Sequence, residues 1–147
     1  MKLWQKEIDT LKIVEKFTVG KDRELDMFLA PFDVLGSLAH IQMLNSVGLL
    51  SDGDLSELQI SLKEIFRDIA EGHFKLEDDV EDIHSQVEFL LTRKLGDAGK
   101  KIHSARSRND QVILDIKLYL RKEIKEIVEA TEAFFHLLQS QSEKYKD

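Results

Sequence analysis

The sequence predicts an all-α protein, and three observations lead to this prediction. The chain of 147 residues contains a single proline, Pro31, and seven glycines, so few residues interrupt regular structure. Hydrophobic residues make up 42% of the chain and charged residues 33%, a balance typical of a globular protein rather than a disordered one. Leu, Ile, Glu and Lys are abundant, and apolar residues recur at helical spacing.

The first third of the chain predicts helices separated by short breaks. Apolar residues at helical spacing indicate a helix over 2–17, followed by a break over 18–22 in which Asp22 is the expected N-cap. The helical pattern resumes over 23–47, where Pro31 should kink the helix or split it in two, because proline lacks the N–H that a helix interior needs.

Small and polar residues organise the following segments. Gly36 and Ala39 lie one helical step apart, and we expect them to form a patch that permits close helix packing. A turn over 48–53 precedes a helix that Asp54 is expected to cap and that ends near Gly72.

An acidic run over 77–82 precedes another helix, which stops at Gly96. Carboxylates at the start of a helix are favoured by the helix dipole, so this run does not require a metal ion. We expect His84, just after the run, to pack or support rather than to catalyse. Residues 97–108 show no periodicity and predict a loop.

The last segment, from Asn109 to Tyr145, predicts one long helix without proline or glycine. Such a helix would be roughly 50 Å long, too long to bury its apolar stripe against one small domain. We therefore expect partner helices, from other copies or from a continuation of the chain, and self-association of the isolated chain. The predicted domains are an N-terminal helical domain over 1–108 and the truncated start of a helix bundle over 109–147.

Composition excludes several classes of function. The chain has no cysteine, which excludes disulfides and thiolate zinc sites. The formal net charge is −7, and the one basic segment has no aromatic residue for base stacking, so no nucleic-acid partner is expected. No apolar run approaches the ~18 residues that span a bilayer, and the N-terminus is charged, so we expect a cytoplasmic protein without a membrane partner.

A basic segment over 100–108 lies directly before the long helix. It contains four Lys and Arg residues in nine positions, where the chain average would give about one. Arg108 can grip a carboxylate with two parallel hydrogen bonds, Ser107 and Asn109 add neutral donors, and the helix N-terminus adds partial positive charge. A carboxylate site and a solvated loop in which Ser107 or Asn109 caps the helix fit this spacing equally well.

Residues 103–112 read His-Ser-Ala-Arg-Ser-Arg-Asn-Asp-Gln-Val. They resemble the first signature segment of the argininosuccinate lyases, within the fumarase/aspartase superfamily, which usually reads His-Thr-Gly-Arg-Ser-Arg-Asn-Asp-Gln-Val. The chain departs from that segment at Ser104 and Ala105. Further segments that resemble the family lie at 2–4, 33–37, 81–84 and 96–100.

The resemblance implies the N-terminal portion of an enzyme of arginine biosynthesis that eliminates arginine from argininosuccinate and leaves fumarate. It implies substrate contacts from Ser107, Arg108 and Asn109, which would hold the fumarate-derived carboxylates. Thr18 stands where the family usually has a serine that contacts the substrate. The residues implied to support these contacts are His103, Arg106, Asp110 and Gln111.

The resemblance also implies that the catalytic residues are missing from this chain. The family's acid–base histidine follows a threonine, whereas no histidine here does. Its serine base lies in a loop with Met-Pro behind it, whereas Pro31 follows Ala30. We therefore expect no activity from the chain alone.

The resemblance implies a homo-oligomer, because the family builds its sites in a homotetramer. It also implies a small-molecule substrate and no metal or organic cofactor. The alternatives are a non-catalytic structural protein derived from the family and a related fumarate-yielding lyase.

Overall fold

The computed structural model describes Phe17, residues 20–78 and residues 80–146. The predicted first helix, except for Phe17, and Thr18 lie outside the described residues. Within the described residues every regular element is helical and no strand occurs, which confirms the predicted all-α class. In chain order the elements are α2 (Asp22–Asp26), α3 (Ala30–Ser46), α4 (Asp52–Ala70), α5 (Ile83–Leu95), α6 (Asp97–Lys100), the 3-10 turn η1 (Lys101–His103) and α7 (Arg108–Lys144).

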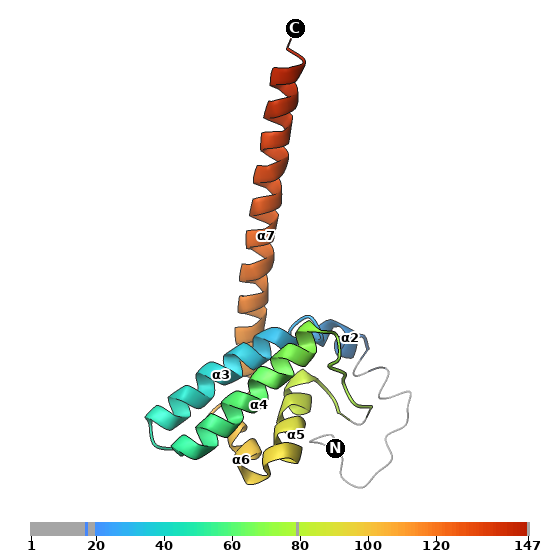
Figure 1. Cartoon of the computed structure of the whole chain (residues 1–147). Helices are drawn as coiled ribbons and strands as arrows, with labels where there is room; N and C mark the ends of the chain where they lie inside the picture. The colour runs from blue at the N-terminus through green and yellow to red at the C-terminus, as the bar shows by residue number, and fades with distance from the viewer. Residues whose placement is uncertain (1–16, 18–19, 79, 147) are drawn as a thin grey trace.

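Helices α2 to α6, with η1, form a packed helical head at one end of α7, which extends far beyond it (Figure 1). Helix α3 packs against α4, α5 and the beginning of α7. The apolar core lies between these helices, and several of its members are completely buried. The completely buried core residues include Val34, Ile41, Leu44, Leu58, Leu62, Ile83 and Leu91.

Pro31 splits the predicted helix over 23–47 in two, as expected. Helix α2 ends at Asp26 and α3 begins at Ala30, so Pro31 lies in the first turn of α3, where its missing N–H has no helical partner to lose. The prediction of Asp22 as an N-cap is wrong, because Lys21 occupies that position and Asp22 is the first residue of α2. At this position its carboxylate still interacts favourably with the helix dipole.

The N-cap of α4 is Ser51 rather than the predicted Asp54. Ser51 has an extended backbone, and its hydroxyl accepts a hydrogen bond from the Asp54 backbone N–H at 3.1 Å. A capping side chain must lie outside the first helical turn, whereas Asp54 lies within that turn. The Asp54 carboxylate instead binds the Lys101 ammonium group at 2.6 Å.

The segment 97–108, predicted as a loop, contains α6 and η1. These elements are four and three residues long, too short for a helical period to appear in the sequence. Gly99 permits α6 to lie directly on α5, because a Cβ atom at this position would approach the Leu91 carbonyl oxygen and the Thr92 nitrogen to 2.5 Å.

Helix α7 touches the helical head through its first turns. A Cβ atom on Gly36 would lie 2.8 Å from Leu114 Cδ2, which confirms that this glycine permits close packing between α3 and α7. Ala39, the other member of the predicted small-residue patch, is exposed. The buried residues of α7 are Gln111 and Asp115.

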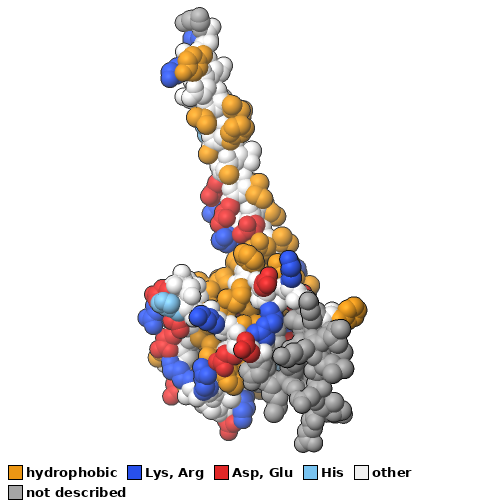
Figure 2. All heavy atoms as spheres, turned by 90° about the vertical axis from the view of Figure 1, so that its right-hand side faces the viewer, with side chains coloured by type: hydrophobic (Ala, Val, Ile, Leu, Met, Phe, Trp, Pro, Cys, Tyr) orange, Lys and Arg blue, Asp and Glu red, His pale blue; other side chains and the backbone are white. Residues whose placement is uncertain are grey.

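Beyond its first turns, α7 leaves the helical head (Figure 1). Exposed apolar side chains follow it along its length (Figure 2). Its 37 residues give a helix about 55 Å long. We call the following exposed residues the α7 stripe: Ile113, Ile116, Leu120, Ile124, Ile127, Phe134 and Leu138. Among the described helices, none is both long and apolar enough to span a membrane.

Candidate functional site

Polar side chains on one face of α3 anchor the turn that leads into α7. The Ser37 hydroxyl accepts a hydrogen bond from Arg106 Nη2 at 3.0 Å, and His40 Nε2 donates to the Ser104 carbonyl at 2.8 Å. Sequence reasoning missed Ser37 and His40. With Asp33 they recur at steps of four and three residues along the helix, a spacing that indicates one shared face.

His40 can make this bond as a neutral ring. Burial lowers the pKa of His40, and the hydrogen bond to the Ser104 carbonyl opposes that shift. Since a carbonyl oxygen accepts but never donates, Nε2 must carry the proton. His40 therefore serves as an anchor for the turn.

Ala105 gives this turn a left-handed backbone, with φ of 57°. A residue with a Cβ atom pays about 1 kcal/mol or more in this conformation, whereas glycine does not. The family that the segment resembles usually has glycine here. The geometry of the turn explains that preference and makes Ala105 a locally strained substitute.

Ser107 is the N-cap of α7, which confirms the capping interpretation of this residue. Its hydroxyl accepts from the Asp110 backbone N–H at 3.3 Å and donates to Asp110 Oδ2 at 2.9 Å. The same carboxylate accepts from the Ser107 backbone N–H at 2.8 Å, completing a capping box. These hydrogen bonds to Ser107 lower the pKa of Asp110.

The capping box limits what Ser107 can offer to a ligand. A hydroxyl has one proton to donate, and Ser107 donates it to Asp110. The hydroxyl can therefore donate to another acceptor only once it has turned away from Asp110.

Arg108 lies at the edge of an open hollow of about 150 Å³, which we call the acidic hollow. Its guanidinium group forms an ion pair with Asp82 and lies 3.8 Å from Glu81, while 38% of the side chain remains exposed. The hollow thus contains more carboxylates than cations, although the basic segment had predicted a positive site. The residues that line it are Asp22, Asp26, Glu81, Asp82, His84, Arg108 and Val112.

Two sets of hydrogen bonds position the acidic side chains that line this hollow. Asp82 is the N-cap of α5, and its carboxylate accepts from the Ser85 N–H at 2.8 Å. The guanidinium group of Arg23 binds four main-chain carbonyls just before Glu81 and so ties this segment to α2. Those carbonyls belong to Leu76 (3.3 Å), Glu77 (2.9 Å), Asp78 (3.2 Å) and Val80.

Arg106 points away from the acidic hollow, into a smaller hollow that we call the inner hollow. The residues that line the inner hollow include Asp33, Ser37, His84, His103, Arg106 and Gln111. The Asn109 side chain is exposed, and Thr18 lies outside the described residues. Within the described part of this chain, the predicted binding and supporting residues therefore face several surroundings rather than one hollow.

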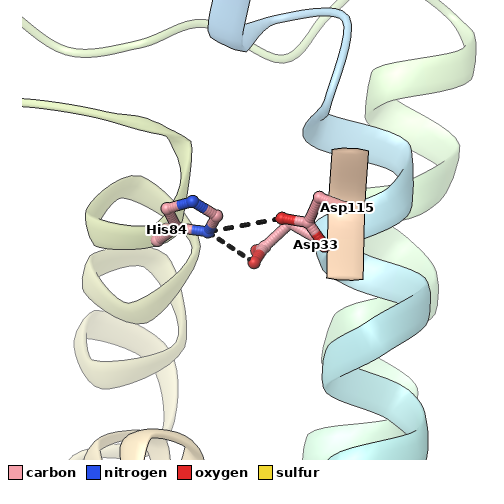
Figure 3. A group of neighbouring side chains, drawn as sticks. All are labelled: Asp33, His84 and Asp115. Carbon is pink, nitrogen blue, oxygen red and sulfur yellow. Dashed lines mark hydrogen bonds and ion pairs between the residues drawn. The ribbon is translucent and has the colours of Figure 1, made fainter. Parts of the chain in front are cut away.

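Asp33, His84 and Asp115 form a buried cluster contributed by α3, α5 and α7 (Figure 3). His84 Nδ1 lies 2.7 Å from Asp33 Oδ1 and 3.7 Å from Asp115 Oδ2. Gln111 Nε2 donates to Asp33 Oδ1 at 3.3 Å. Each aspartate is only 1% exposed, so this cluster links the three helices in a region that excludes water.

The cluster retains a proton near neutral pH. Burial and the neighbouring Asp33 charge raise the pKa of Asp115 to about 7, against the opposing influence of His84 and Arg106. Burial alone would lower the pKa of His84, but the Asp33 hydrogen bond and the Asp33 and Asp115 charges together raise it. His84 is therefore held as an imidazolium over a wider pH range than a free histidine.

Within the part of the chain that the structure describes, the same three residues are the buried set that could hold a metal ion, since their donor atoms all lie within 4.8 Å of one another. His84 Nδ1 faces a carboxylate at hydrogen-bond distance and so carries a proton rather than a lone pair. In this arrangement the cluster is a hydrogen-bonded network, and a metal ion would have to displace that proton.

Comparison with known proteins extends the resemblance beyond the signature segment. The family described as Lyase matches residues 3–147. An argininosuccinate lyase of Bacteroides thetaiotaomicron is 58% identical over 146 residues, which cover 99% of this chain and 33% of the relative. One from Bacteroides fragilis is 57% identical with the same coverage.

A more distant argininosuccinate lyase, from Thermotoga neapolitana, is 41% identical over 126 residues, which cover 86% of this chain and 32% of the relative. The chain spans about a third of the length of the curated relatives it matches.

Proposed function

Because the chain belongs to this lyase family, we propose that it forms the N-terminal part of an argininosuccinate lyase, which eliminates arginine from argininosuccinate and leaves fumarate. The observation that carries the proposal is the Ser-Arg-Asn sequence at 107–109, placed at the N-terminus of α7 with Arg108 beside an open hollow. A cytoplasmic location and a small-molecule substrate are parts of the same proposal.

The charges of the acidic hollow suit a substrate that carries both positive and negative charges. Argininosuccinate carries carboxylates on one half and a guanidinium group on the other. Arg108 can bind a carboxylate through two parallel hydrogen bonds, and the neighbouring acids can bind a cation. The elimination develops negative charge next to a carboxylate, and preorganised donors such as Arg108 and Asn109 would stabilise that charge.

The residues assigned supporting roles make contacts that hold the start of α7 in place. The Asp110 carboxylate holds the start of α7 by closing the capping box with Ser107. Arg106 and Gln111 attach the same segment to α3 through Ser37 and Asp33. We assign the direct substrate contacts to Ser107, Arg108, Asn109 and Thr18, and the supporting roles to His103, Arg106, Asp110 and Gln111.

The proposal places the acid–base residues outside this chain, so the 147-residue chain alone is expected to form no fumarate. The full-length enzyme that contains it is expected to convert argininosuccinate to fumarate, measured by the ultraviolet absorbance of the product. Turnover by the isolated chain would contradict the absence of a base. Failure of the folded full-length protein to form fumarate would overturn the proposed function.

We also propose that copies of the chain associate through the α7 stripe, since its apolar side chains are exposed along most of the helix. The isolated chain is expected to self-associate, and Ile124→Glu should weaken that association by placing a charge on the stripe. Lys125→Glu is the matched control, because Lys125 is exposed but lies off the stripe. Light scattering at increasing concentration measures the change, and a monomer at high concentration would contradict the proposal.

A further inference from the structure

His84 lies between the two hollows, and it lines both of them. It is the second residue of α5, two positions after Asp82, which caps that helix and pairs with Arg108. The His84 side chain is 7% exposed, so most of it is enclosed by protein while part of it lines the acidic hollow. At this position the two ring nitrogens lie in different environments.

The Nδ1 side of the ring faces the buried carboxylates. Asp33 Oδ1 accepts its proton at 2.7 Å, and Asp115 Oδ2 lies 3.7 Å away. Oδ2 of each aspartate is buried without a hydrogen-bond partner among the described residues. The negative charge of this pair is therefore compensated chiefly by His84 and Arg106.

The Nε2 side of the ring points away from both carboxylates (Figure 3). No described residue makes a hydrogen bond to Nε2. A protonated imidazole donates from both nitrogens, so Nε2 is available to donate toward the acidic hollow, where Arg108 also lies.

We propose that Asp33 and Asp115 are positioning residues that hold the His84 imidazolium so that Nε2 donates a hydrogen bond to a substrate carboxylate beside Arg108. This inference rests on the proposed function. Asp33 fixes the orientation of the ring by accepting from Nδ1, and both carboxylates favour its charged form. Neither aspartate touches the substrate in this arrangement, since both are enclosed between α3, α5 and α7.

The pH dependence follows from the two protons of the ring. When His84 loses one proton, Nδ1 keeps the other because it faces Asp33, and Nε2 becomes an acceptor that repels a carboxylate. Dicarboxylate binding should therefore weaken as the pH rises through the pKa of His84, which its carboxylate neighbours raise. Among the described residues, the charged or titratable groups around His84 are Asp22 and Asp26 on α2, Asp33 on α3, Glu81, Asp82 and Glu88 on and before α5, His103 on η1, and Arg106, Arg108 and Asp115 on and before α7.

The test is fumarate binding to the full-length enzyme, measured by calorimetry between about pH 6 and pH 8. Asp33→Asn keeps the shape and an accepting oxygen but removes the charge, so the pKa of His84 should fall. The variant should lose fumarate affinity relative to the unmodified enzyme as the pH rises, and the loss should approach about tenfold for each unit by which the pKa of His84 falls. Asp115→Asn should show a smaller change in the same direction, because its carboxylate lies farther from the ring and, with a pKa of about 7, is fully charged only in the upper part of this range.

Asp97→Asn is the matched control, since Asp97 is exposed on α6 and binds Lys100 at 2.8 Å. It should leave fumarate binding unchanged at every pH. In a His84→Gln background, Asp33→Asn should cause no further change in the pH dependence, because the carboxylate acts through the imidazole. An equal loss in that background would show a merely structural role and would overturn the proposal, as would an unchanged pH dependence in folded Asp33→Asn enzyme.

This experiment separates the inference from the proposed function. An enzyme that forms no fumarate from argininosuccinate but binds fumarate with the expected pH dependence would refute the function and support the His84 assignment. An enzyme that forms fumarate and binds it with the same pH dependence in Asp33→Asn would support the function and refute the assignment. Thermal unfolding of each variant establishes that it is folded before binding is measured.

Discussion

Replacing Arg108 by lysine in the full-length enzyme is expected to lower kcat/KM for argininosuccinate by about 100-fold, the loss typical when a preorganised donor at the developing charge is removed. Lysine keeps the positive charge and can still pair with Asp82, so the fold should persist. It cannot reproduce the two parallel hydrogen bonds with which a guanidinium group binds a carboxylate. Steady-state kinetics with argininosuccinate measures the effect.

Arg93→Lys is the matched control for this substitution. Arg93 pairs with Glu77 at 3.2 Å and lies over the Phe89 ring, and its side chain is 59% exposed. The control exchanges the same chemical groups in a partly exposed ion pair away from the acidic hollow, and it should leave the kinetics unchanged. Near-normal kinetics of the Arg108→Lys enzyme would count against the substrate-binding role of Arg108.

Replacing Gly99 by alanine is expected to lower the free energy of unfolding by about 3 kcal/mol, the upper range for overpacking of a rigid site. The new Cβ atom would approach the Leu91 carbonyl oxygen and the Thr92 nitrogen to 2.5 Å. Both are backbone atoms of α5 and cannot move aside as the end of a flexible side chain can. The helices α5 and α6 would have to separate, which exposes part of the core.

Gly53→Ala provides the comparison, because a Cβ atom there would meet nothing closer than Ser51 Oγ at 3.9 Å. Alanine favours helices over glycine, so this variant should be neutral or more stable by up to about 1 kcal/mol. Denaturant unfolding of both variants measures the two changes. If Gly99→Ala unfolds at the same denaturant concentration as Gly53→Ala, the close packing between α5 and α6 is contradicted.

Local chemistry made several parts of this fold predictable. Pro31 interrupts a helical pattern because it lacks an N–H, and α3 does begin immediately before it. The absence of proline and glycine after residue 108 predicted a long helix, and α7 runs from Arg108 to Lys144. Ser107 and Asn109 were both capping candidates, because serine and asparagine before an uninterrupted helical segment favour that position, and Ser107 is the residue that caps α7.

Other local features were ambiguous in the sequence. Serine and aspartate both cap helices. The sequence pattern places Ser51 in the preceding turn and predicts Asp54 as the cap. In the structure Ser51 caps α4, because the helix begins at Asp52 and Asp54 lies within its first turn, where it binds Lys101 on η1, 47 residues away. Short elements such as α6 cannot be predicted from hydrophobic periodicity, because a single turn contains no repeat.

The sequence by itself determined the helical class, the long final helix and the concentration of basic residues ahead of it, because each depends on neighbours within a few positions. Only the tertiary structure decided which charges meet. Arg106 turns inward to Ser37, 69 residues away, whereas Arg108 turns to Asp82 and the acidic hollow. His84 and Asp33 are 51 residues apart, yet they share a buried hydrogen bond. Packing of α3, α5 and α7 creates these pairs, and a local residue pattern contains no information about which distant side chain will lie opposite.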